Sequence, residues 1–552
     1  MADKLKIVAL GGLNEIGKNI TAYEFKNDII IVDCGMGFPD EDLYGVDVVV
    51  PNVAYLAKNR EKIRGIFLTH GHEDHIGAIP YVLKDITAPI FATPMTLGLV
   101  KLKLEEHRLM DIAQFVEIEA GKNYKAGCFS IEPIHINHSI AGSVSFAITT
   151  PMGVVVQTGD FKIDPTPIND EMTNLTRFGE LGKKGVLALL SDSTNVERSG
   201  FSSSERRVGV RFDSLFDSCK ERIIITTFAS NVHRVQQIMN IAARYGRKVA
   251  VTGRSMENMI KVAVQLGYMN VPPDTLVDIA TVKNLPKEKI VIITTGSQGE
   301  TMSALYRMAF SGHKYIEIQP GDHVVMSASA VPGNETTVSK IVNELFRKGA
   351  EVMYRAVDEL HVSGHGFQEE LKIIMALTKP KFFIPVHGEH RHLKMHAEIA
   401  KTMGIPAKNV IISDIGQVIE ISRKDIKLNG TVQSGRTFVD GTGIGDVGSI
   451  VLRDRKHLAT DGMLVIVAGI SMEDGSVVSG PDIITRGFVY VKENATLIDE
   501  IRSVALESLN QCNLRNISDF TTIKSAIKGA VSQYLYKITK HNPMILPVIL
   551  EV

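Results

Sequence analysis

The sequence contains little cysteine and no long apolar segment. Its 552 residues include only four cysteines, which are scattered and form no C-x-x-C pair. This spacing argues against a disulfide framework or a thiolate zinc site, and it predicts a reducing, cytoplasmic location. No apolar stretch approaches the roughly 20 residues that a membrane helix needs, and the N-terminal apolar segment is too short for a signal peptide. We therefore expect no membrane association.

A strong excess of charge of one sign is also absent. The 61 basic and 62 acidic side chains leave a formal net charge of −1. The charge of the whole chain therefore gives no argument for nucleic-acid binding, and a basic groove would have to arise from local arrangement. Hydrophobic residues make up 44% and charged residues 22% of the chain. These fractions are ordinary for a globular protein, and the length predicts more than one domain.

Short strand-like segments and helical patterns alternate along the chain. The first part is rich in strand-like segments such as NDIIIVDCG and GVVVQTGD, with helical patterns between some of them, which predicts a layered α/β domain. From Ser202 the alternation of strand and helix becomes more regular and predicts a parallel sheet with crossover helices. Glycine-rich sequence near 430–450 indicates a linker or an extended crossing segment. The remaining residues form another compact α/β pattern.

A cluster of histidine and aspartate follows one of the predicted strands. The segment FLTHGHEDHIG places His70, His72, Asp74 and His75 within six positions, directly after an apolar stretch. Neutral imidazoles and a carboxylate suit zinc or manganese. Since one loop offers more ligands than a single tetrahedral ion takes from it, we predict a site for two ions. A solvated polar turn is the alternative.

Ionisable residues also end several other apolar segments. Open α/β sheets gather their ligands at the carboxyl ends of the strands, so we expect these residues to join the histidine cluster. They are Asp33, His138, Asp160, Asp192 and His387. Any one of them alone is typical of a turn, but together with the cluster they support a site hypothesis.

These motifs resemble those of a known enzyme family. THGHEDHIG is similar to the His-x-His-x-Asp-His signature of the metallo-β-lactamase fold, and LLSDSTN, HVSGHG and PVHGEH resemble motifs of its beta-CASP branch, whose members act on nucleic acids. Together with ALGGLNEIGKN, DCGMGFPDEDLYGVD, TGDFKIDPTP, FASNVHRVQQ and DIITRGFVY, they make the chain resemble the ribonuclease J family along essentially its whole length. The chain departs from the expected pattern at His390, where we expect an aromatic residue.

The resemblance implies an α/β fold made of a metallo-β-lactamase αββα sandwich, an inserted beta-CASP α/β domain and a small C-terminal α/β domain. The expected boundaries are 1–201 and 361–431 for the two parts of the metallo-β-lactamase domain, 202–360 for the beta-CASP domain, 432–460 for a linker and 461–552 for the C-terminal domain. RNA is expected to run between the first two domains. The C-terminal domain is expected to support a homodimer or a homotetramer.

The resemblance also implies two divalent metal ions, with zinc as the first choice and manganese as the alternative. Such ions activate a water for in-line attack on the scissile phosphorus. The expected ligands are His70, His72, His138 and Asp160 for one ion, and Asp74, His75, His387 and the shared Asp160 for the other. Asp33 would orient a ligand histidine without touching an ion, although a simple turn acid is an equal alternative.

Further residues are expected to act on the leaving group and on RNA phosphates. By the resemblance, His365 protonates the departing 3′ oxygen and Asp192 orients it. Phosphate binding alone is the alternative for His365. Phosphates are expected at a helix N-terminus and at a tight turn, which contain Ala229, Ser230, Asn231, His361, Val362, Ser363, Gly364 and His365. An ordinary N-cap is the alternative for Ser230.

Asp440 and three histidines after His387 could be mistaken for further metal ligands. Asp440 is a candidate ligand of a structural calcium ion, together with backbone carbonyls near Tyr44 and Val46, but a turn aspartate is the preferred interpretation. Three further histidines follow His387 at helical spacing, and we expect them to lie on a solvated helix face rather than to bind a metal. They are His390, His392 and His396.

The predicted function is that of a two-metal-ion ribonuclease. The family likeness implies 5′→3′ exonuclease activity that prefers a 5′-monophosphate, and endonuclease activity, in RNA maturation and mRNA decay. Single-stranded RNA and the proteins of an RNA-degradation assembly are the expected partners. A hydrolase of small esters or lactones is one alternative, against which the inserted and C-terminal domains argue. A non-catalytic RNA-binding scaffold is another, against which the complete ligand set argues.

Overall fold

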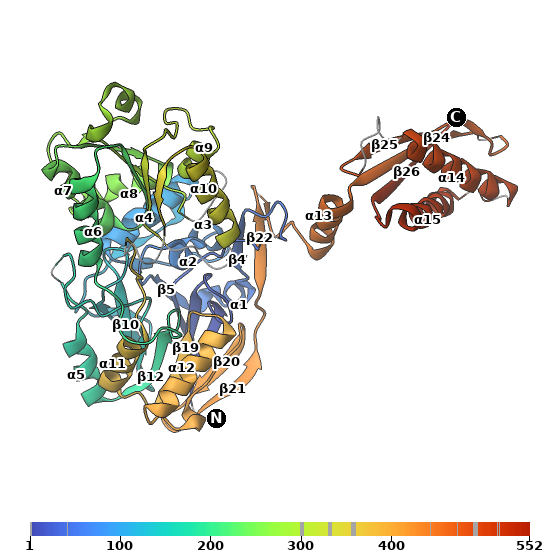
Figure 1. The fold of residues 1–552 in the computed structure, drawn as a ribbon. Coiled ribbons are helices and arrows are strands. Elements are labelled where there is room, and N and C mark those ends of the chain that lie inside the picture. Colours follow the sequence, from blue (N-terminus) through green and yellow to red (C-terminus); the bar gives the residue numbers. More distant parts are fainter. Residues whose placement is uncertain are drawn as a thin grey trace. The chain divides into compact units, whose positions relative to one another are not determined.

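The computed structural model describes residues 3–40, 42–169, 171–297, 303–328, 334–354, 360–441, 443–471, 473–488, 495–515, 517 and 519–552 (Figure 1). The chain divides into two compact units, Met1–Phe38 with Val48–Thr437 and Pro39–Asp47 with Phe438–Val552. Each unit has a hydrophobic core of its own.

Two sheets pack face to face in the first unit. The strand order is β21-β20-β1-β2-β3-β5-β6-β7 in the first sheet and β19-β12-β11-β10-β9-β8 in the second. Both sheets contribute side chains to one core, in which Phe67 stacks on Phe91 with ring centroids 4.3 Å apart and meets Phe146 of the second sheet edge-on. The first sheet contains β1 (Leu5–Gly11), β2 (Ile20–Phe25), β3 (Asp28–Val32), β5 (Ile63–Phe67), β6 (Ile90–Ala92), β7 (Phe115–Glu117), β20 (Gln417–Ile421) and β21 (Ile426–Thr431). The second contains β8 (Tyr124–Ala126), β9 (Phe129–His135), β10 (Val144–Thr150), β11 (Gly153–Gln157), β12 (Val186–Asp192) and β19 (Phe382–Val386).

Helices cover the outer faces of these sheets, which confirms the predicted αββα layering. On the second sheet, Phe178 of α5 and Ile374 of α11 join Leu189 and Phe383 in a further apolar cluster. Figure 1 shows α5, α11 and α12 beside this sheet. The helices and the remaining strand of this region are α1 (Ala54–Lys58), α2 (Glu73–Ile76), α3 (Ile79–Val82), α4 (Pro94–Glu106), α5 (Leu175–Lys184), α11 (Gln368–Thr378), α12 (His390–Thr402) and β4 (Val48–Pro51).

A third sheet is parallel throughout its paired strands, as predicted, with the order β15-β14-β16-β13-β17-β18. Every residue of β13 and β16 is buried, as expected for parallel strands covered on both faces. Its strands are β13 (Ile223–Thr226), β14 (Lys248–Thr252), β15 (Leu276–Val277), β16 (Ile290–Thr294), β17 (His323–Met326) and β18 (Glu351–Met353). The helices around it are α6 (Glu205–Ser218), α7 (Val232–Arg244), α8 (Arg254–Gln265), α9 (Ala304–Ala309) and α10 (Glu335–Arg347).

The second unit is a small α/β domain. Strands β24 (Met463–Ile470), β25 (Val477–Arg486) and β26 (Met544–Glu551) pair in the order β25-β24-β26. Helices α14 (Ala495–Leu514) and α15 (Phe520–Thr539) share one core with this sheet. The last two residues of the DIITRGFVY motif lie outside the described residues.

The segment expected to be a linker, 432–460, contains regular structure. It holds β22 (Arg436–Asp440), β23 (Gly443–Ile444) and most of α13 (Ser449–Asp461). Short 3-10 turns occur at Arg60–Lys62, Met110–Ile112, Ile279–Asn284, Lys287–Lys289 and Ala407–Asn409. Among the helices of the described residues, none is both long and apolar enough to span a membrane.

Candidate metal centre

The carboxyl ends of strands from both sheets bring histidine and aspartate side chains together. β3 runs parallel to β5, and β12 runs parallel to β11 and β19, so the strand ends in each set lie at the same edge of their sheet. The residues at or just beyond these ends are Asp33 after β3, His70 after β5, Asp160 after β11, Asp192 on β12 and His387 after β19. The predicted convergence of strand-end residues is therefore present.

Two residues at these strand ends have an uncommon backbone conformation. Asp33 has a φ of 62° and His387 a φ of 55°, which place both in the left-handed region. For residues other than glycine this conformation costs about 1 kcal/mol or more. The Asp33 amide donates to the Phe67 carbonyl and the His387 amide donates to the Gly12 carbonyl, each at 2.9 Å. The surrounding backbone thus holds both side chains at the cluster.

One half of the cluster consists of imidazole nitrogens, and we call His70, His72 and His138 the nitrogen group. Nδ1 of His72 lies 3.0 Å from Nε2 of His70 and 3.1 Å from Nε2 of His138. Burial lowers the pKa of all three rings, and that of His72 falls to about 4. The rings are therefore neutral near pH 7, which is the form that binds metals.

Two of these rings have hydrogen-bond partners on their far side, and one of these contacts fixes a tautomer. Nδ1 of His70 lies 3.0 Å from the Thr69 hydroxyl, and Nδ1 of His138 lies 2.7 Å from the Gly364 carbonyl oxygen. A neutral imidazole carries one proton, and a carbonyl oxygen can only accept, so Nε2 of His138 presents a lone pair to the cluster. Convergent imidazole lone pairs fit a zinc-type cation.

The other half of the cluster contains acids, and we call Asp74, His75, Asp160 and His387 the carboxylate group. Asp160 lies 3.1 Å from Nε2 of His75 and 2.9 Å from Nδ1 of His387, and Asp74 lies 3.3 Å from Nε2 of His387. Burial opposes protonation of His75 and His387, but the neighbouring carboxylates, Asp160 foremost, raise the pKa of both rings well above the ordinary value. Asp160 is also 3.7 Å from Nε2 of His70, so it links the two groups.

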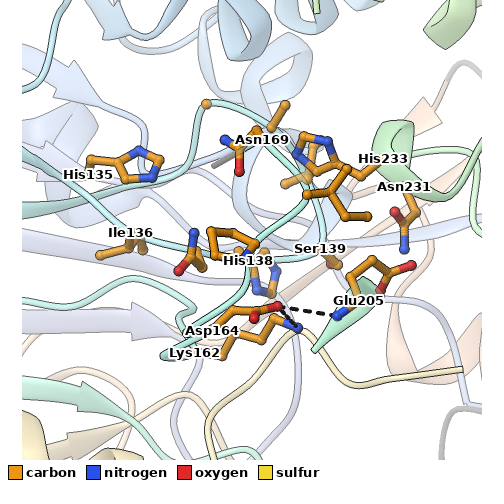
Figure 2. A pocket seen from close by; sticks show the side chains of 16 residues that line it. His135, Ile136, His138, Ser139, Lys162, Asp164, Asn169, Glu205, Asn231 and His233 are labelled. Carbon is orange, nitrogen blue, oxygen red and sulfur yellow. Dashed lines mark hydrogen bonds and ion pairs between the residues drawn. The ribbon is translucent and has the colours of Figure 1, made fainter. Parts of the chain in front are cut away.

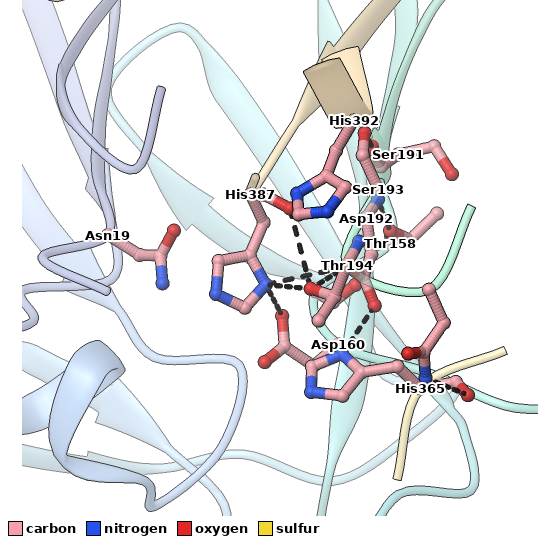
Figure 3. A network of polar contacts seen from close by, with 12 residues as sticks. Asn19, Thr158, Asp160, Ser191, Asp192, Ser193, Thr194, His365, His387 and His392 are labelled. Atoms are coloured by element: carbon pink, nitrogen blue, oxygen red, sulfur yellow. Dashed lines mark hydrogen bonds and ion pairs between the residues drawn. The ribbon is translucent and has the colours of Figure 1, made fainter. Parts of the chain in front are cut away.

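Asp33 supports the cluster from behind. Its carboxylate accepts from the Thr69 backbone amide at 2.8 Å and lies 2.8 Å from Nδ1 of His75. This contact turns Nε2 of His75 towards Asp160. On the opposite side, the Asn19 amide donates to the Asp74 carbonyl at 3.1 Å and lies 3.0 Å from Nε2 of His75. Figure 3 shows Asn19 directed towards the cluster from the loop after β1.

A His–Asp pair lies next to the carboxylate group. Nδ1 of His365 lies 2.7 Å from Asp192 Oδ2, and Asp192 Oδ1 accepts from the hydroxyl of Thr194 at 2.7 Å (Figure 3). The same hydroxyl is 3.1 Å from Nδ1 of His387. Burial lowers the pKa of His365, but the Asp192 carboxylate outweighs it, so the net pKa is raised. A raised pKa makes His365 a better proton carrier near neutral pH.

The HVSGHG turn packs directly on the nitrogen group. The Ser363 hydroxyl accepts from the Asn195 amide at 2.7 Å, and the Val362 side chain is buried. A Cβ on Gly364 would lie 2.7 Å from Cε1 of His138. Only glycine therefore fits at this position, and the turn is held between Asn195 and a predicted metal ligand.

The N-terminus of α7 lies beside the same turn. Asn231 is buried, and its side chain accepts from the Arg234 amide at 3.0 Å. Asn231 is therefore the N-cap of α7, rather than Ser230. Ala229 and Ser230 are half-buried. Nη1 of Arg234 lies 3.2 Å from Nδ1 of His361, so the helix N-terminus and the turn contact each other.

A small polar pocket lies next to the metal cluster (Figure 2). His138, Ser139, Lys162, Asn231 and His233 are among its lining residues. It therefore borders the nitrogen group on one side and the start of α7 on the other.

Comparisons with known families cover most of the chain. The metallo-beta-lactamase superfamily matches residues 13–181, and the ribonuclease J beta-CASP domain matches 220–345. The Zn-dependent metallo-hydrolase RNA specificity domain matches 349–412, and the ribonuclease J C-terminal domain matches 450–552.

Full-length relatives agree with these matches. The chain is 41% identical to ribonuclease J 1 of Streptococcus pyogenes over 99% of its own length and 98% of that protein. It is 40% identical to ribonuclease J2 of Bacillus subtilis over 100% and 99%, and 41% identical to ribonuclease J of Thermus thermophilus over 100% and 96%. The chain belongs to the ribonuclease J family.

A solved structure agrees with the fold of this ribonuclease J family member. The crystal structure of a protein of unknown function from Enterococcus faecalis matches 76% of this chain and 100% of its own, with a TM-score of 0.53 and 16% identity. The fold class predicted from the sequence is confirmed by the family matches, and the clustered histidines and aspartates fit divalent metal ions.

Sequence analysis missed several residues that contact the cluster. Thr69, Thr194, Asn195 and Asn19 hold predicted ligands or the HVSGHG turn by hydrogen bonds. Their positions in the sequence were the only available signal. Thr69 directly precedes His70, and Thr194 and Asn195 follow Asp192 in the LLSDSTN motif.

The prediction that the three histidines of α12 lie on a solvated face is wrong for two of them. His390 is exposed, but His392 and His396 are buried. His392 lies on the buried side of the helix, and Nδ1 of His396 is 3.0 Å from the Ser193 hydroxyl. Burial lowers the pKa of His396 to about 3, so it is a neutral core residue beneath the Asp192 strand end.

Asp440 lies in the second unit and belongs to no group of potential metal ligands found among the described residues. The Arg455 guanidinium forms an ion pair with Asp440 and donates to the Tyr44 carbonyl at 3.0 Å. Arg455 thus contacts both the carboxylate and a backbone carbonyl that were considered as ligands of a structural calcium ion.

Proposed function

We propose that this ribonuclease J family member hydrolyses single-stranded RNA with two divalent metal ions, as a 5′→3′ exonuclease that prefers a 5′-monophosphate and also as an endonuclease. One observation carries the proposal: Asp160 links the nitrogen group to the carboxylate group, directly beside the His365–Asp192 pair. This arrangement provides two ion sites, a shared carboxylate and a proton donor in one cluster, which suits phosphodiester hydrolysis.

The two groups would hold the ions separately. The nitrogen group with Asp160 would hold one ion and the carboxylate group the other, with zinc favoured over manganese because imidazole is the predominant ligand. Bound there, the ions would supply an activated water for in-line attack and would neutralise charge on the phosphoryl oxygens. Asp33 would orient His75 through its Nδ1 atom.

The proton for the leaving group would come from His365. Its Nδ1 atom is held by Asp192, so Nε2 is the atom that gives its proton to the departing 3′ oxygen. The raised pKa of His365 favours the protonated ring that this step requires. Thr194 would fix the positions of the Asp192 and His387 side chains relative to each other, because its hydroxyl contacts both.

RNA phosphates would bind where the HVSGHG turn meets the N-terminus of α7. His361, backbone amides of the turn and the N-terminus of α7 would supply donors there. The neighbouring pocket is lined by Lys162, Asn231 and His233, whose polar side chains can contact a nucleotide. We place the 5′-terminal nucleotide in this pocket. With its 5′ end held there, the RNA would have its first phosphodiester over the metal cluster.

The C-terminal domain would join copies of the chain into a homodimer or a homotetramer. Leu546, Val548 and Leu550 of β26 are exposed, and they alternate with Ile545, which is buried in the core shared with α14 and α15. This leaves an apolar strip on the opposite face of the sheet, which supports the proposal. A cytoplasmic location and a place in an RNA-degradation assembly stay predictions.

The test is a comparison of 5′ ends on one RNA oligomer. With zinc or manganese present, we expect mononucleotides to form fastest from 5′-monophosphate RNA and more slowly from triphosphate and hydroxyl RNA, while internal cleavage is insensitive to the end. Equal release of mononucleotides from all three RNAs would contradict the preference. Turnover of a generic lactone without cleavage of any RNA would instead support the small-ester alternative.

A further inference from the structure

We infer that Arg234 is a positioning residue for RNA binding: it holds the His361 imidazole in one tautomer, with its proton on Nε2. The inference rests on the proposed role of His361 as a phosphate donor. It adds a residue that would not touch the RNA itself but would decide which atom of His361 can donate to a phosphate.

Arg234 is rigidly held inside the third-sheet domain. Its side chain is fully buried, and Nε and Nη2 form a forked pair with the Glu205 carboxylate of α6 at 2.7 and 2.8 Å. Nη1 donates to the Ser327 carbonyl, just after β17, at 2.6 Å. A forked guanidinium pair fixes orientation as well as charge. The position of Nη1 is therefore set by α6 and β17, independently of His361.

The chemistry of this contact determines the tautomer of His361. Nη1 of Arg234 lies 3.2 Å from Nδ1 of His361. A guanidinium has only donors and stays protonated, so Nδ1 accepts in this contact and the single proton of a neutral ring sits on Nε2. The Ser327 carbonyl, which also contacts the ring, is already occupied by Nη1 of Arg234. Burial, followed by the positive charge of Arg234, lowers the pKa of His361 to about 3. The ring is therefore a neutral N–H donor through the physiological pH range.

Arg234 also supports the second predicted phosphate site. Its backbone amide donates to the Asn231 side chain that caps α7, so one residue contacts both the helix N-terminus and the HVSGHG turn. Within the part of the chain that the structure describes, no hydrogen bond or ion pair joins Arg234 to His365 or to the metal cluster. Loss of the Arg234 fork should therefore weaken RNA binding and leave the chemical step unchanged.

Arg222 offers a matched control. It is also buried and forked, with Nε 3.0 Å from Asp322 and Nη2 2.6 Å from the Glu317 carbonyl, in the same domain. Among the described residues, it forms no hydrogen bond with His361. Arg222→Lys and Arg234→Lys each break one buried fork, but only the second also removes the donor to Nδ1 of His361.

The experiment measures KM and kcat for 5′-monophosphorylated RNA with the full-length, metal-loaded protein. For Arg234→Lys we expect KM to rise about 10-fold, the size of one hydrogen bond to a charged group, and kcat to stay within about 2-fold. Arg222→Lys should lower thermal stability without the rise in KM. Should Arg234→Lys not fold, Glu205→Gln loosens the same fork by a smaller change and should raise KM in the same direction.

A double-variant cycle separates positioning from a purely structural role. His361→Gln places an amide N–H donor near the position of Nε2 and has no tautomer to set. In that background Arg234→Lys should give no further rise in KM. An equal rise in both backgrounds, or an equal rise in Arg222→Lys, would overturn the inference. Absence of RNA cleavage by the unaltered protein would instead refute the proposed function.

Discussion

The two halves of the metal cluster differ in charge although they share Asp160. The nitrogen group contains three rings whose pKa values are lowered, so its ligands are already deprotonated near pH 7. The carboxylate group contains His75 and His387, whose pKa values are raised by the acids around them. An ion that enters the nitrogen group meets free lone pairs, whereas an ion that enters the carboxylate group has to displace protons. We therefore expect two sites of unequal character, and four experiments address that difference.

The largest effect is expected for Asp160→Asn, since Asp160 serves both halves. The variant should bind both ions weakly and lose RNA cleavage by about 10³-fold or more, as measured by elemental analysis and an RNA assay. Asp322→Asn is the control, because Asp322 is also a fully buried carboxylate, held by Arg222 in the third sheet. Cleavage within 10-fold of the unaltered rate would show that the halves do not depend on a shared acid.

His72→Ala and Asp74→Ala should each disable one half. We expect each variant to retain close to one ion per chain and to lose cleavage by about 10²- to 10³-fold. Elemental analysis of the purified variants counts the ions. Loss of both ions from both variants would mean that the cluster acts as one site rather than as two.

Asp33→Asn should affect the halves unequally. Asp33 orients His75 directly and reaches His70 only through the Thr69 hydroxyl. We expect about 10- to 100-fold weaker metal binding in the carboxylate group and a smaller loss in the nitrogen group. Metal titrations in the His72→Ala and Asp74→Ala backgrounds isolate each half. Equal losses in the two backgrounds would contradict the assigned role of Asp33.

The smallest effect is a difference in released protons. With raised pKa values, His75 and His387 are both protonated near pH 7, so metal binding to the carboxylate group should release about two protons more than binding to the nitrogen group. The metal affinity of the carboxylate group should already be reduced at neutral pH, because both rings take up protons as pH falls through their raised pKa values. The affinity of the nitrogen group should hold until pH approaches the pKa of His72, about 4. Calorimetry in buffers of different ionisation enthalpy measures the protons, and equal release from both halves would refute the difference.

The main features of the centre were predictable from the sequence because they follow from strand geometry. Asp33, Asp160 and His387 each follow an apolar segment, and the HGHEDH cluster follows another. Parallel strands bring their carboxyl ends to one edge. Thr69, Thr194 and Asn195 were not predicted, because a single hydroxyl or amide in a loop has no spacing that distinguishes a supporting contact from a solvated turn.

One expectation was wrong, and one segment contains more regular structure than its composition indicated. His392 and His396 were assigned to solvent because histidine is polar, but they share a helix face with Leu393, Ala397 and Ala400, which are buried. Their spacing indicated burial more reliably than their residue type. The segment 432–460 was expected to be a linker because glycine is frequent there, yet most of α13 forms in it. Its first 17 residues are glycine-rich, and the helix begins only after them at Ser449.

The contact between Gly364 and His138 makes metal binding and RNA binding parts of one equilibrium. The Gly364 carbonyl accepts from His138, and the same turn is proposed to hold a phosphate. Any factor by which a bound ion tightens the turn for RNA must equal the factor by which RNA tightens the site for the ion. RNA should therefore slow the loss of the ion held by His138 to a chelator, and Gly364→Ala should uncouple the two affinities as well as weaken each.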